Sequence, residues 1–437
     1  MKNVNYDKDI KELFFILILL IFMLGYFTYI KFTYKAPVKE DTNPDEVVDN
    51  TSSGGNFGIE FIKNIDKLND DNYLVSPYSM EVALDMLRKG ANGTSLEELN
   101  NVLGNREIEK FSVKDRIGIA NSLFIKNDFK EIVNSEFSDY LLNTYGSDII
   151  YDDFATPDAI NNWCKEKTWN MIDPLLEEIG NEFVIGIANA VAIDVDWKYN
   201  FECNNTNSSE FTKSDGSVIN VEMMNNSYYS DVKYFENDTA KGVVIPYQAY
   251  NEEGNEVDDG TKLEFVGILP NNDIKEYISN FNTDVLNSID EGEEASNDKK
   301  INVYLPRFSY DYNVNDAIGV LGSMGISSVF SKSDADLTNI ISKDEMTKHG
   351  IENIYVNKVL HKTHIDLNEK GTKAAAVTYI EVSETLGALD VEENNDIDIE
   401  FNKPFIYMIR DSASGEILFF GSVYNPNEWN GSTCSSE

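Results

Sequence analysis

The segment that most constrains this chain runs from Glu369 to Thr378 and reads EKGTKAAAVT. Three successive alanines favour a helix locally. The residues that follow contradict a helix, because every second position is small or apolar: Thr372, Ala374, Ala376, Thr378, Ile380 and Val382. The intervening positions, Ala375 among them, are more polar and carry all the charge. A period of two is typical of a strand with one buried face, so we expect a segment that is exposed in one state and able to enter a sheet in another.

The remainder of the chain shows helical patterns first and strand patterns later. Helices are expected from about Ile59, over Ser76–Gly90, from a capping-box match at Thr94–Glu97, and over Pro157–Glu178 with a break near Pro174. Strands are expected at Val184–Asp194, Lys241–Tyr247, Leu263–Leu269, Ile301–Ser309 and Ile354–Leu367. This order, without strict alternation, indicates an α+β fold with antiparallel or mixed sheets. Two acidic stretches, Asn251–Gly260 and Asp290–Asp298, are expected to be surface loops.

Composition limits both the core and the partners. A chain of 437 residues with 42% hydrophobic content can bury one large core or two ordinary ones. Its net charge of −40 repels nucleic acids and anionic lipid surfaces, so no nucleic-acid partner is expected. A simpler explanation of the same charge is that it keeps the protein soluble and has no role in partner selection. No feature of the sequence indicates an oligomer, so we expect a monomer.

The N-terminal region predicts a membrane anchor. After a short segment, residues 1–12, the run 13–30 is almost wholly apolar and long enough to span about 27 Å as a helix. We interpret it as an uncleaved signal anchor; a buried helix of the folded domain is the alternative. Residues 31–55 are polar and acidic, as in a flexible tether. The expected location is a single-pass cell-membrane protein with its folded domain outside, although lysines on both flanks leave the orientation nearly tied.

Motifs for catalysis and metal binding are missing from the sequence. There is no nucleophile elbow, no zinc-protease motif, no phosphate-binding loop and no Cys-x-x-Cys. Cys164, Cys203 and Cys434 are odd in number and widely spaced, which is no disulfide framework and no metal site; Cys434 could be free or pair between molecules. His361 and His364 would point to opposite faces of a strand. We therefore expect no enzyme activity, no metal and no cofactor.

Seven segments, in order along the chain, resemble those of the serpin family. They are the alanine-rich segment above, NYLVSPYS at Asn72–Ser79, ANAVAIDVDWKYNF at Ala188–Phe201, VYLPRF at Val303–Phe308, LGSMGISSVF at Leu321–Phe330, FNKPF at Phe401–Phe405 and ILFFGSVYNP at Ile417–Pro426. The resemblance implies a serpin domain at 56–427, with a reactive loop at 369–400 and a C-terminal tail at 428–437. It also implies the serpin fold, in which helices pack around a large mixed sheet with two further sheets and an exposed reactive loop.

Serpins are single-use protease inhibitors, and the resemblance implies that mechanism here. A protease cleaves the reactive loop and becomes attached to it as an acyl-enzyme; the loop then inserts into the large sheet and the protease is distorted before it is released. The target endopeptidase is thus the expected partner. The alternative is a non-inhibitory serpin-fold protein that acts as a binding, chaperone or surface module, which would tolerate bulky or charged residues in the inserting positions.

The resemblance assigns residues to three parts of this mechanism. The hinge, from which the loop inserts, comprises Glu369, Gly371, Thr372, Ala374, Ala375, Ala376 and Thr378. The sheet-opening cluster, a hydrogen-bonded group beneath the large sheet, comprises Ser76, Ser79, Asn189 and His361. Trp197 is placed where the hinge first enters the sheet. We further expect Gly371 to adopt backbone angles that are unfavourable for other residues. We expect Thr372, which is uncharged, to enter the sheet without the free-energy cost of burying a charge.

The cleaved bond is expected between Thr385 and Leu386, by the usual family spacing from Gly371. The stretch to Phe401 is about eight residues longer than usual, so Leu386, Leu389 and Asp390 remain rivals for the cleavage position. No Lys or Arg occurs from residue 379 to residue 402. Because trypsin-like enzymes need a cation in their acidic pocket, we expect a subtilisin-, elastase- or chymotrypsin-like serine protease, or a papain-like cysteine protease, as the target.

Overall fold

The computed structural model describes residues 56–104, 108, 113–147, 149–180, 183–258, 260–372 and 395–429. The predicted anchor at 13–30 and its tether at 31–55 lie outside these residues. So do most of the predicted reactive loop and the end of the tail. Within the described part of the chain, no helix combines the length and the apolar composition needed to cross a bilayer.

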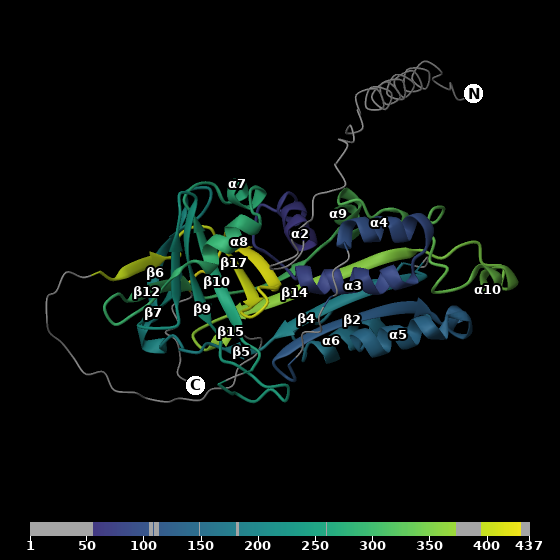
Figure 1. Cartoon of the computed structure of the whole chain (residues 1–437), viewed down its shortest axis with the longest axis horizontal. Coiled ribbons are helices and arrows are strands. Elements are labelled where there is room, and N and C mark those ends of the chain that lie inside the picture. Colours follow the sequence, from purple (N-terminus) through teal and green to yellow (C-terminus); the bar gives the residue numbers. More distant parts are fainter. Residues whose placement is uncertain are drawn as a thin grey trace, which may run out of the picture. The chain divides into compact units, whose positions relative to one another are not determined.

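The large sheet has seven strands and carries the hinge (Figure 1). Its strands, in spatial order, are β3 (Ile149–Asp152), β2 (Ile117–Lys126), β4 (Ile185–Ile193), β14 (Val356–Leu367), β15 (Gly371–Thr372) and β5 (Val195–Asp196), with β13 (Phe308–Asn313) paired to β14. The β4–β14 and β2–β3 pairs are parallel, whereas β2–β4, β13–β14 and β14–β15 are antiparallel. The sheet is therefore mixed, as predicted.

Two further sheets complete the β structure. The second sheet has the order β1 (Tyr73–Val75), β18 (Ile417–Val423), β17 (Phe405–Asp411), β10 (Leu263–Pro270), β9 (Ala240–Pro246), β8 (Lys233–Glu236) and β11 (Glu293–Glu294). The third sheet has the order β16 (Ile397–Glu400), β12 (Ile301–Pro306), β7 (Val218–Tyr228) and β6 (Asn207–Thr212). The predicted α+β class, with one large mixed sheet and two further sheets, is confirmed.

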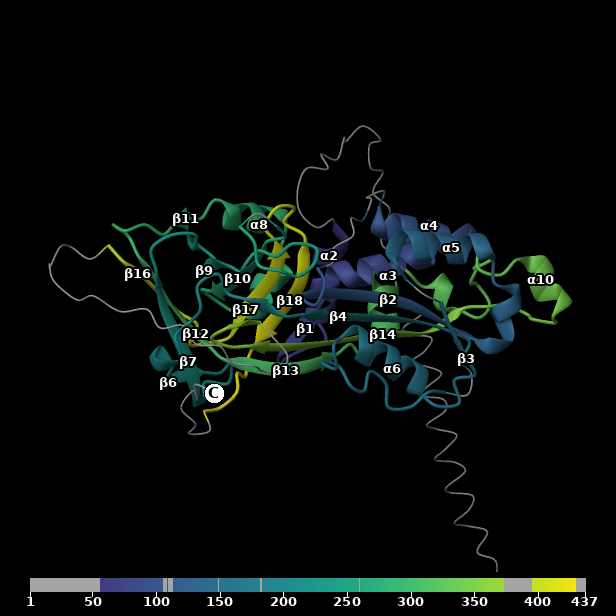
Figure 2. The same ribbon diagram turned by 90° about the horizontal axis from the view of Figure 1, so that it is seen from below.

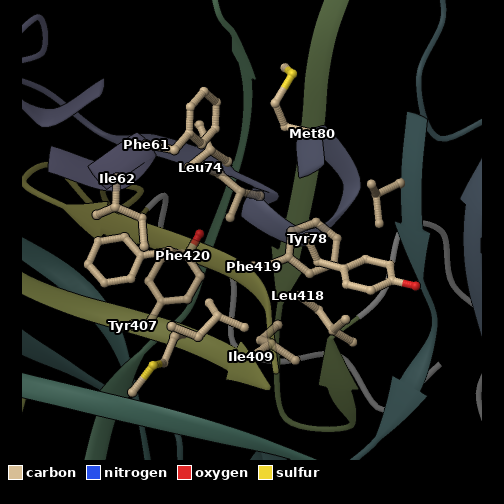
Figure 3. Close-up of a cluster of buried hydrophobic side chains, with 14 of the residues drawn as sticks. Phe61, Ile62, Leu74, Tyr78, Met80, Tyr407, Ile409, Leu418, Phe419 and Phe420 are labelled. Carbon is tan, nitrogen blue, oxygen red and sulfur yellow. The ribbon is translucent and has the colours of Figure 1, made fainter. Parts of the chain in front are cut away.

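Helices cover the sheets and close the core. They are α2 (Asn56–Asp66), α3 (Pro77–Gly90), α4 (Gly93–Leu103), α5 (Ser135–Tyr145), α6 (Asp158–Lys167), α7 (Ile274–Ser279), α8 (Thr283–Asp290), α9 (Ala317–Ser323) and α10 (Lys343–Lys348). Helix α3 packs on β4 and β2 of the large sheet and on β18 of the second, so it links the two (Figure 2). Its buried side chains Tyr78 and Met80 join Phe61, Phe419 and Phe420 in the cluster of Figure 3.

Two local expectations need correction, and one is confirmed. The helix expected to begin at Thr94 begins at Gly93, because Asn92 and not Thr94 provides the cap, its side chain accepting from the Gly93 N–H. The helix expected over 157–178 ends at Lys167, since Trp169 and Asn170 adopt left-handed backbone angles that a helix cannot continue through. Ser76 caps α3 as predicted.

Candidate functional site

The large sheet is closed at one end of the β4–β14 pair and parted at the other. Parallel pairing runs from Val356 opposite Ile185 to Lys362 opposite Ala190. Beyond that point β15 lies between the strands, with Thr372 antiparallel to Leu367 of β14 and to Val195 of β5. The first residues of the predicted hinge thus already occupy the position of an added central strand.

Gly371 is required here for a different reason from the one expected. Its φ does not lie in the left-handed region. A Cβ at this position, however, would lie 2.0 Å from the Val195 carbonyl oxygen and 2.7 Å from Asp196 Cα. The close approach of the hinge backbone to β5, and not an unusual backbone angle, therefore excludes any side chain.

Thr372 is buried and hydrogen-bonded. Only 1% of its surface is exposed, and its hydroxyl lies 2.6 Å from the Tyr247 hydroxyl. The Tyr247 ring stacks on Trp197 at a centroid distance of 4.5 Å. Trp197 in turn holds the turn before the hinge, because its indole Nε1 donates to the Asn368 carbonyl at 2.9 Å and its backbone N–H donates to the Lys370 carbonyl at 2.7 Å. Trp197 thus lies beside the hinge, where the resemblance placed it.

Glu369 is tied to the protein body by its side chain and its backbone. Its carboxylate accepts a hydrogen bond from the Thr206 hydroxyl at 2.7 Å and faces Arg307 Nε at 3.4 Å. Its carbonyl accepts from the Phe201 N–H at 2.9 Å. These contacts fix the start of the hinge relative to the third sheet, because Arg307 also pairs with Glu222 of β7 at 2.9 Å.

The four residues of the predicted sheet-opening cluster come together as a hydrogen-bonded group. His361 Nε2 accepts from the Ser76 N–H at 3.0 Å, and its Nδ1 lies 2.9 Å from Asn189 Oδ1. Asn189 Nδ2 donates to the Ser79 hydroxyl and, at 2.7 Å, to Asn121 Oδ1. His361 and Asn189 are direct partners in the parallel β4–β14 pair. The cluster therefore bridges the adjacent strands β4 and β14 and connects them to α3.

His361 is held in its neutral form. It is fully buried, and burial lowers its pKa from 6.5 to about 3. Because Nε2 accepts a hydrogen bond from Ser76, the proton of the neutral ring belongs on Nδ1, where it can be donated to Asn189. The ring thus acts as a donor across the β4–β14 junction and an acceptor toward α3.

Sequence reasoning missed three residues that hold the hinge: Tyr247, Thr206 and Arg307. Tyr247 and Thr206 follow no motif, and their contacts join residues more than a hundred positions apart in the chain. Arg307 stands within VYLPRF, a segment whose resemblance to the family assigns no role to the arginine. The remaining predicted residues, Ala374, Ala375, Ala376, Thr378, Thr385 and Leu386, lie outside the described part of the chain.

The cysteines differ from the expectation of no disulfide. Cys203, in the 3₁₀ turn between Phe201 and Thr206, is disulfide-bonded, whereas Cys164 is a buried free thiol. Burial raises the pKa of the Cys164 thiol to about 12, so this side chain is unreactive. In the described ranges, no group of three or more His, Cys, Asp or Glu side chains is placed to hold a metal ion.

Comparison with known proteins identifies the class that this fold and site define. Residues 52–426 match the family described as Serpin (serine protease inhibitor). The chain therefore belongs to the serpin family, a family of protease inhibitors rather than enzymes, some of whose members are non-inhibitory.

Among individual proteins, the chain is 29% identical to mouse (Mus musculus) neuroserpin over 83% of this chain and 88% of the relative. It also resembles the crystal structure of tengpin, a thermophilic serpin, in its native state, with 30% identity, a TM-score of 0.71, and coverage of 89% and 97% of the two chains. Tengpin in its latent state gives a TM-score of 0.65 at 27% identity, covering 85% and 97%.

Proposed function

We propose that this protein is a single-use protease inhibitor that acts by inserting its cleaved reactive loop between β4 and β14. The observation that carries the proposal is the position of Gly371 and Thr372, which pair antiparallel with both β14 and β5. The loop begins inside the sheet, at the end where the sheet is already parted. Insertion would continue a strand that has already started.

The strand registers support this path from two sides. If the pairing of β15 with β5 continues, Ala374, Ala376 and Thr378 come to lie opposite Ile193, Val191 and Asn189. If the pairing of β15 with β14 continues, the same three residues come to lie opposite Ile365, Thr363 and His361. Both extrapolations bring Thr378 between Asn189 and His361, which are direct partners in the closed sheet.

The chemistry of the inserted residues suits their new neighbours. Thr378 would replace the His361–Asn189 hydrogen bond, and a hydroxyl can both donate to and accept from those groups. The alanines at 374 and 376 add little volume to a packed interior. The parallel β4–β14 pair would be exchanged for two antiparallel pairs, which are slightly more stable per residue. Insertion is therefore favourable once cleavage releases the far end of the loop.

The proposed target is a protease that does not require a basic residue at the cleavage site. Residues 379–402 contain no Lys or Arg, which leaves an acidic trypsin-type pocket without a partner. A subtilisin-, elastase- or chymotrypsin-like serine protease fits better, as does a papain-like cysteine protease. The bond between Thr385 and Leu386 remains the proposed site.

The test is incubation of the protein with a panel of these proteases and trypsin, followed by denaturing electrophoresis. We expect an adduct with at least one of the non-trypsin-like enzymes that survives denaturation, and release of a C-terminal peptide whose mass reports the cleaved bond. Cleavage by every active protease without any adduct would contradict inhibition and favour the binding-module alternative. An adduct with trypsin would contradict the proposed target class alone.

We also propose that residues 13–30 anchor the protein in the cell membrane, with the serpin domain outside. Two observations support this proposal: the length of the apolar run, and the disulfide at Cys203, which suits an oxidising compartment. The test is fractionation of cells that express the full chain or a variant lacking 13–30. The full chain should remain with membranes in alkaline carbonate and be digested by protease added to intact cells; release by carbonate would contradict the anchor.

A further inference from the structure

The acidic stretch at 251–260 lies at the surface, as the sequence predicts, and none of its described residues is buried. It forms the end of a hairpin between β9 and β10, in which Tyr250 pairs with Thr261 and with Glu256. We call residues 248–262 the acidic hairpin. Gly254 has a φ of +80°, and a Cβ there would lie 2.2 Å from the Lys114 carbonyl oxygen. The Lys114 N–H also donates to the Glu252 carbonyl at 3.2 Å. The hairpin is therefore packed tightly against the chain that leads into β2.

Arg116 joins this hairpin to β5. Its Nε donates to the Gly254 carbonyl at 3.4 Å, and its guanidinium lies over the Tyr250 ring at 4.6 Å. Its Nη1 lies 3.2 Å from Asp196 Oδ2 and donates to the Asp194 carbonyl at 3.3 Å. The Arg116 guanidinium thus contacts the hairpin through Nε and through its flat face. Through Nη1 it contacts Asp194, which precedes β5, and Asp196, which ends it.

Tyr250 holds the same strand independently of Arg116. Its hydroxyl accepts from the Asp196 N–H at 3.0 Å and donates to Asp196 Oδ2 at 3.1 Å. The ring is buried, with 1% of its surface exposed. Asp196 is in turn the direct partner of Gly371 in the β5–β15 pair. The acidic hairpin therefore fixes the strand that pairs with Gly371 of the hinge.

The other side of the gap is fixed to the same second sheet. The Thr363 hydroxyl of β14 donates to the Leu74 carbonyl of β1 at 2.8 Å. The Tyr310 hydroxyl of β13, the neighbour of β14, donates to the Tyr73 carbonyl at 3.0 Å. The hairpin extends from β9 and β10 of that sheet. Both edges of the parted end, β14 and β5, are thus hydrogen-bonded to the second sheet or to the hairpin that extends from it, and β15 pairs with both.

We propose that Arg116 and Tyr250 are positioning residues for inhibition: they hold β5 away from β14, so that the parted end of the sheet stays ready for the hinge. This inference rests on the proposed inhibitory function and adds to it a role for the acidic hairpin. Insertion beyond Thr372 does not require these contacts to break, because β15 already separates β5 from β14. Without them β5 and the hinge residues paired with it are held less firmly, and insertion is slower relative to release of the protease.

The test uses the full-length variants Tyr250→Phe, which removes only the hydroxyl, and Arg116→Gln. Each is incubated with the protease that the unmodified protein traps, and adduct, cleaved protein and intact protein are quantified by electrophoresis. We expect a several-fold rise in the ratio of cleaved protein to adduct in both variants, with little intact protein remaining. A folding defect would instead expose many sites to the protease, so the expected product, a single cut in the reactive loop, is verified by its mass. Lys332→Gln, which loses an exposed lysine paired with Glu352 at 3.5 Å, is the matched control and should behave like the unmodified protein.

A second readout needs no protease. Hydrogen exchange of the peptide that contains residues 368–372 should be faster in both variants than in the unmodified protein and the control. Unchanged exchange together with an unchanged ratio would overturn the inference. So would a lower ratio with faster spontaneous insertion, since the contacts would then restrain the opening and not prepare it. If the unmodified protein traps no protease but the variants still exchange faster, the proposed inhibition fails and the positioning of β5 stands.

Discussion

At the scale of single residues, the hydrogen bonds of His361 make the pairing of β4 with β14 depend on pH, because they require the neutral ring. Its ring bonds to the Ser76 N–H on one side and to Asn189 on the other, within a fully buried site. A proton added to Nε2 would remove the acceptor that Ser76 needs and would bury an uncompensated charge. The closed β4–β14 pair is therefore compatible with the neutral ring only.

The first prediction concerns pH. The pKa of His361 falls from 6.5 in the unfolded chain to about 3 in the folded protein. Between these values the unfolded state binds the extra proton, so this group's contribution to stability is complete above pH 6.5 and is lost as the pH falls toward 3. The expected loss is about 1.4 kcal/mol per pH unit within that window. Chemical denaturation of the isolated intact protein at several pH values measures it.

The control for this prediction is His361→Gln, in which the amide retains a donor and an acceptor but does not titrate. The difference in unfolding free energy between the unmodified protein and this variant should shrink steadily below pH 6.5. A difference that is the same at pH 7.5 and pH 4.5 would show that His361 does not carry the predicted pH dependence.

The second prediction concerns Gly371. A Cβ at this position would lie 2.0 Å from the Val195 carbonyl oxygen, so Gly371→Ala must move the hinge away from β5. We expect more cleaved protein relative to adduct, because insertion starts from a displaced strand. Quantitative electrophoresis after reaction with a trapped protease measures this ratio. Gly322→Ala is the matched control and should leave the ratio unchanged, since a Cβ added at this position in α9 would enter open space and its φ is not positive.

At the scale of secondary-structure elements, the alternation in the reactive loop yields the third prediction. The extrapolated register brings Ala376 to the buried face, opposite Val191 and Thr363, whereas Ala375 faces outward. Ala376→Glu should therefore cost several kcal/mol in the inserted state, because the carboxylate would be buried without a partner. We expect Ala376→Glu to convert the protein into a cleaved substrate, while Ala375→Glu retains adduct formation. Equal effects of the two substitutions in the adduct assay would contradict strand insertion in this register.

The same scale shows what the sequence can and cannot predict. The strands β4, β9, β10, β12 and β14 lie within three residues of their expected bounds. β4 and β10 are nearly continuous buried runs, and much of β12 and β14 alternates between buried and partly exposed residues; both patterns are typical of strands. The end of α6 was misplaced, since the left-handed Trp169 and Asn170 carry no local signal. The surface position of 251–260 was predicted, but its backbone contacts with Lys114 and Arg116 were not, because those residues lie far away in the sequence.

For the candidate site, the sequence motifs predicted many of the residues but not the hydrogen bonds and ion pairs between them. The resemblance brought Ser76, Ser79, Asn189 and His361 to one place, and the structure adds the direction of each hydrogen bond. The hydrogen bond from Thr206 to Glu369 and the ion pair between Arg307 and Glu369 depend on how the third sheet packs against the large sheet. Such a contact between distant segments follows from the packing of whole sheets, and no local pattern encodes it.

At the scale of the whole molecule, contacts between the sheets hold one end of the large sheet parted while the other end stays paired. The parted end of the large sheet is fixed on both sides, through Thr363 on β14 and through Asp196 on β5. The closed end is joined by a short parallel pair and by the His361–Asn189 bond. Within the described residues, the added central strand comprises Gly371 and Thr372. The intact protein is therefore expected to be less stable than a form in which the loop has inserted.

The measurement that tests this claim most directly is thermal unfolding of the soluble serpin domain before and after a single cut in the reactive loop, with the Ala376→Glu variant as control. We predict that the cut protein unfolds at a clearly higher temperature than the intact protein, and that the cut variant gains much less. If the cut and intact forms of the unmodified protein unfolded at the same temperature, the loop would not insert, and the proposed mechanism would be wrong.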